Sequence, residues 1–101
     1  MALPLIERGG DGLISVAANA FAARYSRMIG KAVSGDMKAA YADWDLVSMV
    51  TRALFDEGNP TGVKAALAVR NIISNVLRLP LVESSGALYA KIENLMKEGS
   101  L

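Results

Sequence analysis

The spacing of hydrophobic residues changes near residue 19 of this 101-residue chain. Before that point, Leu13-Ile14-Ser15-Val16 is a short, partly β-branched apolar run that follows the turn Gly9-Gly10-Asp11-Gly12. This pattern is typical of a buried strand. Residues 4–8 are predicted to be the end of a helix, because glycine after them can take the left-handed conformation that closes helices.

After residue 19 the hydrophobic residues recur with the period of amphipathic helices. Four helices are predicted, over residues 20–33, 36–55, 60–77 and 85–98. Trp44 suits either a buried anchor or an exposed interface, because indole is amphipathic. The predicted fold class is mostly α, a bundle of four main helices with one short N-terminal strand. Its predicted core is Tyr25, Met28, Trp44, Val47, Leu54, Leu67, Ile73, Leu88, Ile92 and Leu95.

Helix boundaries are predicted from capping and helix-breaking residues. Gly58 should end the second helix, and Pro60 should take the first position of the third, where its missing N–H costs nothing. Gly99 should end the fourth helix. The expected N-terminal caps are Asn19, the turn at residues 34–36, Asn59, and Ser84 or Ser85.

The predicted strand Leu13–Val16 has no convincing partner in this sequence. A buried strand needs hydrogen-bonding neighbours on both edges and apolar cover on both faces, because its backbone groups cannot be left dry and unpaired. The extended apolar connector Arg78–Val82 contains a proline, which limits any sheet it could join. The chain is therefore interpreted as the tail of a larger α/β protein.

Composition and charge narrow the classes of partner. The chain is 52% hydrophobic and 21% charged, and its 11 basic and 10 acidic residues leave a net charge of +1. This balance gives no strong field for nucleic acid or an anionic membrane, and we expect neither as a partner. The apolar stretch Leu13–Ala23 is too short to span a membrane, and the N-terminus lacks the pattern of a secretory signal. The absence of cysteine fits a cytoplasmic protein.

The residue types present limit the chemistry that this chain can perform. Without cysteine or histidine, it has no thiol nucleophile, no Cys/His zinc site and no histidine acid–base catalyst. Lys64 lies among small apolar residues and could be a desolvated nucleophile, but a first-turn helical lysine with its ammonium in water is the favoured interpretation. Asp43 and Asp45 should face different sides of a helix. The glycines precede the strand, whereas a dinucleotide loop follows one. We expect no catalytic, cofactor-binding or metal-binding residues and no cofactor.

Three segments taken in order resemble the C-terminal part of dihydrodipicolinate synthase, also called 4-hydroxy-tetrahydrodipicolinate synthase, in the N-acetylneuraminate lyase class of pyruvate-dependent barrels. They are GGDGLISVAAN at Gly9–Asn19, NPTGVKAAL at Asn59–Leu67 and LRLPL at Leu77–Leu81. The resemblance implies a parent lyase with a (β/α)8 TIM-barrel fold. It would join pyruvate, held as a lysine Schiff base, to aspartate semialdehyde in lysine biosynthesis. Residues 1–33 would then be the last barrel strand and helix, and residues 34–101 a helical C-terminal extension, together one C-terminal fragment.

The resemblance carries no catalytic residue onto this chain. The family's Schiff-base lysine and its proton-relay tyrosine and threonine precede the matching segment, and Lys64 corresponds to a different lysine, the one in the asparagine-proline motif. Gly62 stands where the family usually has a second proline, and a common proline is missing around Phe21–Ala23. Both differences leave open a change of substrate. The chain alone is predicted to be inactive.

Two functional hypotheses follow from the sequence. In the first, the chain is a structural C-terminal fragment of a pyruvate-dependent synthase, and its partner is the rest of the parent barrel. In the second, it is a free-standing helical oligomerisation or interaction module without catalysis. Because Leu13–Val16 lacks neighbours, we also expect a homo-oligomer when the chain is isolated. The strand would then pair with a second copy or convert to helix continuous with residues 20–33.

Overall fold

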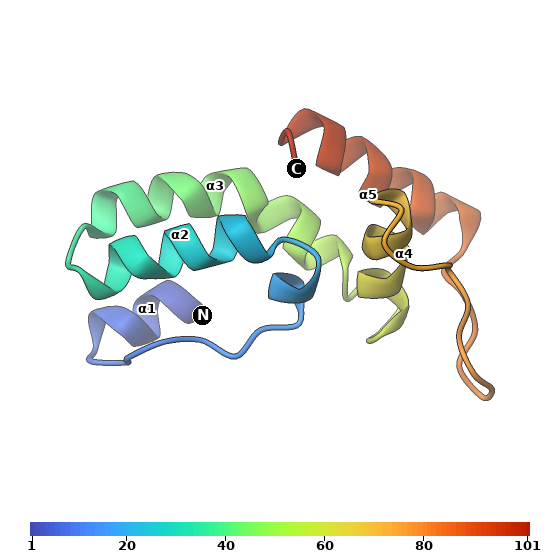
Figure 1. The fold of residues 1–101 in the computed structure, drawn as a ribbon, viewed down its shortest axis with the longest axis horizontal. Helices are drawn as coiled ribbons and strands as arrows, with labels where there is room; N and C mark the ends of the chain where they lie inside the picture. Colours follow the sequence, from blue (N-terminus) through green and yellow to red (C-terminus); the bar gives the residue numbers. More distant parts are fainter. The chain divides into compact units, whose positions relative to one another are not determined.

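The computed structural model describes residues 1–101 and is mostly helical, as predicted (Figure 1). The chain forms two compact units, Met1–Val47 and Ser48–Leu101. The elements in chain order are α1 (Ala2–Glu7), the 3-10 helix η1 (Ala17–Asn19), α2 (Ala22–Val33), α3 (Met37–Ala53), α4 (Thr61–Val69) and α5 (Gly86–Glu98).

The first unit is built around α2, against which both α1 and η1 pack. The amphipathic pattern of α2 places Tyr25, Met28 and Ala32 in the core. Gly9 ends α1 with a φ of +105°, and its N–H donates to the Ile6 carbonyl. The predicted closure of the first helix by glycine is therefore confirmed.

The predicted strand at Leu13–Val16 is wrong for the chain in this structure. Residues 11–15 form neither strand nor helix, and Val16 has helical dihedral angles that lead into η1. The physical reason is that a strand exists only by pairing its backbone with a neighbour, and this chain supplies none. The alternative of a helix continuous with residues 20–33 is also wrong, since Phe21 interrupts it with a φ of −127°.

Two of the four predicted N-terminal caps are confirmed. The Asp36 carboxylate accepts the N–H of Ala39 at 3.2 Å, and the Ser85 hydroxyl accepts the N–H of Leu88 at 3.1 Å. Asn19 does not cap α2, because its side-chain amide donates to the Val16 carbonyl within η1. Asn59 is not a cap either, since Pro60 occupies the capping position of α4.

The second unit is held by packing of α4 on α5. The predicted third helix, residues 60–77, is wrong in its second half, because α4 ends at Val69. Asn71 takes a left-handed φ of 59°, and the N–H of Ile72 donates to the Leu67 carbonyl, which closes the helix. Residues 70–85 form a long irregular connector, and Gly99 follows the last residue of α5 as predicted.

Most of the predicted core is buried. Ile73 is exposed because the helix stops before it, and Trp44, Leu67 and Leu95 are only partly buried. The confirmed core residues are Tyr25, Met28, Val47, Leu54, Leu88 and Ile92.

Candidate functional site

Lys64 has a specific contact in the second unit. It lies in the first turn of α4, and its ammonium donates to the backbone carbonyl of Val76 in the irregular connector. Thr61, one turn earlier, donates its hydroxyl to the carbonyl of Val82 at 3.4 Å. These two side chains therefore attach the connector to α4, which gives Lys64 a structural role.

The two aspartates of α3 lie in different surroundings. The Asp43 carboxylate is 2.8 Å from the Lys31 ammonium and 3.9 Å from the Arg27 guanidinium, and so links α3 to α2. Asp45 is exposed. Carboxylates in such different positions cannot act together on one substrate atom, and the structure does not bring them into a catalytic pair.

The chain shows neither a metal-binding cluster nor a membrane-spanning helix. No three His, Cys, Asp or Glu side chains gather as a metal-binding group. None of the helices combines the length and the hydrophobicity that crossing a membrane requires.

A carboxylate caps the start of α5 in the second unit. Glu57 accepts both the N–H of Ser85, at 2.8 Å, and the Ser85 hydroxyl. These hydrogen bonds lower the pKa of Glu57 below the ordinary range of a glutamate. Lys91 pairs with Asp56 at 2.6 Å beside this contact. Both carboxylates already have partners, so the group fixes the start of α5 and leaves little free polar capacity for a ligand.

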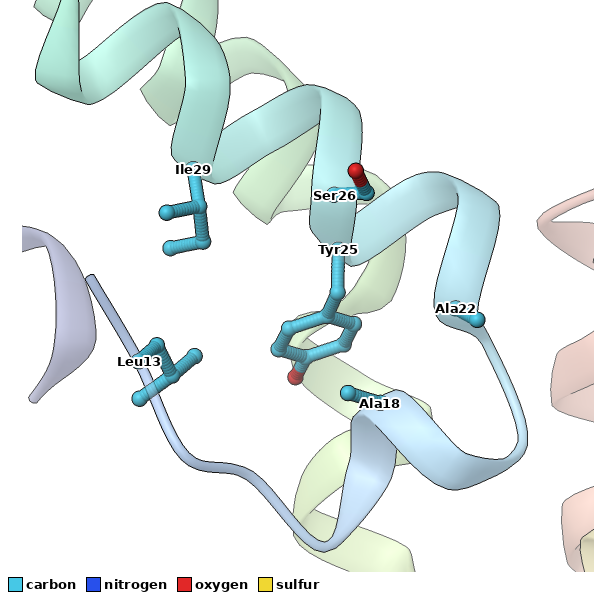
Figure 2. Close-up of a pocket in the computed structure, with 6 residues that line it drawn as sticks. All are labelled: Leu13, Ala18, Ala22, Tyr25, Ser26 and Ile29. Carbon is cyan, nitrogen blue, oxygen red and sulfur yellow. The ribbon is translucent and has the colours of Figure 1, made fainter.

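An open hollow in the first unit is the best candidate for a functional surface. It has a volume of about 260 Å³ and lies between the N-terminal segment and α2. Figure 2 shows Leu13 on that segment facing Tyr25 and Ile29 of α2 across the hollow. Apart from two hydroxyl groups, its lining side chains are aliphatic or aromatic. The lining residues are Leu13, Ala18, Ala22, Tyr25, Ser26 and Ile29.

The segment beside the hollow has backbone groups that no other backbone group of the chain pairs with. Residues 11–15 make no backbone-to-backbone hydrogen bond within the chain. The side chain of Leu13 lines the hollow, whereas the side chain of Ile14 is fully exposed, at 104%. Residues 11–15 and the residues that line the hollow are together called the open face.

Part of the open face was predicted from the sequence, and the rest was not. Leu13–Val16 was identified as a segment that lacks partners, but the helical side of the hollow was not. A signal was present in the sequence: Ala18, Ala22, Ser26 and Ile29 follow one another at spacings of three or four residues. Small residues at helical spacing leave room for a neighbouring element.

Comparisons of the sequence and of the structure with known proteins all match the same kind of protein. The sequence model of the Dihydrodipicolinate synthetase family matches residues 1–99. The 4-hydroxy-tetrahydrodipicolinate synthase of Phocaeicola vulgatus is 41% identical over 95 residues, which cover 94% of this chain and 32% of that protein.

Two solved structures have the same fold over this region. Dihydrodipicolinate synthase from Thermotoga maritima matches with a TM-score of 0.94 and 34% identity over 98% of this chain and 34% of that one. The chloride-inhibited enzyme from Acinetobacter baumannii, complexed with pyruvate, matches with a TM-score of 0.91 and 30% identity, over 97% of this chain and 34% of that one. The chain thus spans about a third of the length of the relatives that it matches.

Proposed function

The chain belongs to the Dihydrodipicolinate synthetase family, and we propose that it is the C-terminal part of a (β/α)8-barrel synthase that condenses pyruvate with aspartate semialdehyde. The observation that carries the proposal is the match of nearly the whole chain, at a TM-score of 0.94, to a third of a dihydrodipicolinate synthase. The reaction would belong to lysine biosynthesis. A cytoplasmic location is part of the same proposal, and cell fractionation tests it.

Within that barrel, residues 1–33 would supply the last strand and helix, and residues 34–101 the C-terminal extension. Leu13–Val16 would become a strand once neighbouring strands pair with its free backbone groups. The unpaired backbone of residues 11–15 supports this assignment. The role of the fragment is therefore to complete the barrel and to cover it with helices.

The lysine that would hold pyruvate as a Schiff base is expected in the part of the barrel that precedes this chain. Active sites of such barrels take residues from the ends of several strands, and this chain would contribute one strand. Lys64, in the first turn of α4, is engaged by the Val76 carbonyl. The isolated chain should therefore be inactive.

A hybrid enzyme tests this function. This chain replaces the matching third of the Thermotoga maritima relative, and the condensation of pyruvate with aspartate semialdehyde is measured. We expect an active hybrid, in which borohydride traps pyruvate on a lysine from the Thermotoga portion. Substitution of Lys64→Arg serves as the control and should leave the adduct unchanged.

Two results would contradict the proposal. One is a hybrid that folds, as judged by its circular dichroism, but neither condenses the substrates nor forms the pyruvate adduct. The other is a stable borohydride-reduced adduct on Lys64 of the isolated chain, which would make this residue a nucleophile.

A free-standing oligomerisation module is the second candidate. The observation that favours it is the open face itself, where a fully exposed Ile14 stands next to backbone without partners. Such a segment can pair with the same segment of a second copy. An encoding reading frame without upstream barrel sequence would support the module over the fragment.

A further inference from the structure

The open face is already formed in the chain on its own. α1 and η1 pack on α2, and Phe21, Tyr25 and Met28 are buried in this unit. The arrangement of the chain also agrees with that in a whole dihydrodipicolinate synthase, at a TM-score of 0.94. A surface that keeps its bound shape before binding pays little ordering entropy when a partner arrives.

The chemistry of the open face specifies what can cover it. Residues 11–15 offer free N–H and C=O groups, so the partner must bring strand edges that pair with them. Leu13 faces the hollow and α2, whereas Ile14 is fully exposed, so the partner must also supply apolar cover on the side of Ile14. An incomplete barrel meets both needs, because opening a closed sheet leaves two strand edges and exposes its apolar interior.

We propose that the open face binds, without a covalent link, a separate polypeptide that carries the part of a family barrel preceding this third, with Ile14 as the anchor of the contact. This inference rests on the proposed function. It goes further by stating that the preformed open face is sufficient for assembly and that peptide continuity is not needed.

Ile14 is the anchor because its side chain has the most apolar surface left to bury. It is fully exposed in the free chain, and barrel interiors are filled by bulky branched side chains in layers. Replacing it with aspartate would place an unpaired charge in that interior, which is strongly unfavourable. The same substitution should leave the stability of the free chain nearly unchanged, since an exposed side chain contributes little to it.

The test uses the full 101-residue chain and, as the probe, the Thermotoga maritima relative shortened by its matching third. The two polypeptides are refolded together from denaturant and separated by size exclusion, and the dissociation constant is measured by titration. The relative's own C-terminal third is the positive control. Leu79→Asp is the matched variant, because Leu79 is an apolar residue that is 85% exposed and lies outside the open face.

We expect a one-to-one complex. Binding of the probe should also displace any second copy of the chain from the open face. Ile14→Asp should weaken binding by at least about tenfold, the effect of losing a buried anchor, whereas Leu79→Asp should bind like the unchanged chain. Restored condensation activity in the mixture would add support.

Several results would overturn the inference: no complex with this chain, whether or not the relative's own third binds, or a complex that Ile14→Asp leaves intact. The hybrid enzyme keeps the two proposals separable. An active hybrid without assembly from separate chains overturns only this inference, whereas assembly with an inactive hybrid overturns only the proposed synthase.

Discussion

At Gly62 the first turn of α4 lies directly on the backbone at the end of α3. A Cβ atom at this position would be 1.9 Å from the carbonyl oxygen of Leu54 and 2.5 Å from its carbonyl carbon. No side chain fits at such distances unless the backbone moves. A proline, which the family usually has at this position of the asparagine-proline motif, also carries a Cβ and would not fit this structure without such a movement.

The first prediction is that Gly62→Ala destabilises the chain. The free energy of unfolding should fall by about 1–3 kcal/mol, the usual cost of overpacking, because α4 must move away from Leu54. Gly30→Ala in α2 is the control, since a Cβ there has nothing within 4 Å. It should raise the free energy by roughly 0.5–1 kcal/mol through helix propensity. Urea unfolding followed by circular dichroism measures both, and equal stability of the two variants would refute the close approach.

At the scale of single elements, sequence patterns located the helices well but not all of their ends. Ser84 or Ser85 was predicted as a cap because serine precedes an amphipathic pattern, and the hydrogen bond from the Leu88 N–H identifies Ser85. The end of α4 was missed, because hydrophobic residues continue with helical spacing through Val76 while Asn71 turns the backbone left-handed. Periodicity records which residues are apolar, and it does not record where the backbone leaves the helix.

The second prediction compares two apolar residues of the second unit. Ile92 is completely buried in α5, and Ile92→Ala should cost about 2–5 kcal/mol of unfolding free energy. Leu67 was predicted to be in the core, but it is only partly buried near the end of α4, so Leu67→Ala should cost roughly 1–2 kcal/mol. Urea titrations of the two variants give the comparison. An equal cost at both positions would mean that α4 continues and buries Leu67 fully.

At the scale of the whole molecule, the lone apolar segment was the most informative part of the sequence. The need of Leu13–Val16 for neighbours could be argued from backbone hydrogen bonding alone, and residues 11–15 are indeed unpaired. The shape of the hollow was not foreseen, because it depends on how η1 and α2 meet, although the residue spacing marks its helical side. A strand that requires partners from elsewhere can be recognised in a sequence, but its conformation without them cannot be read from the same pattern.

Exposed large apolar side chains occur in several parts of the chain, and two of these parts, residues 13–14 and the irregular connector, lie in irregular segments. The irregular connector exposes Val76, Leu79 and Val82, but the carbonyls of Val76 and Val82 already accept hydrogen bonds from α4. Pro80 in the same connector has no N–H to donate. The open face therefore remains the better surface for pairing with a second copy.

The third prediction is that the isolated chain self-associates through residues 11–15. Two copies can pair these segments across a two-fold axis, which satisfies the free backbone groups and buries Ile14. Light scattering over a dilution series should show a mass above that of the monomer that falls on dilution. Ile14→Asp should give a monomer, because the pairing would bring two unpaired charges together, whereas Leu79→Asp should still associate. A monomer at every concentration, or association that Ile14→Asp leaves unchanged, would show that this segment is not the contact.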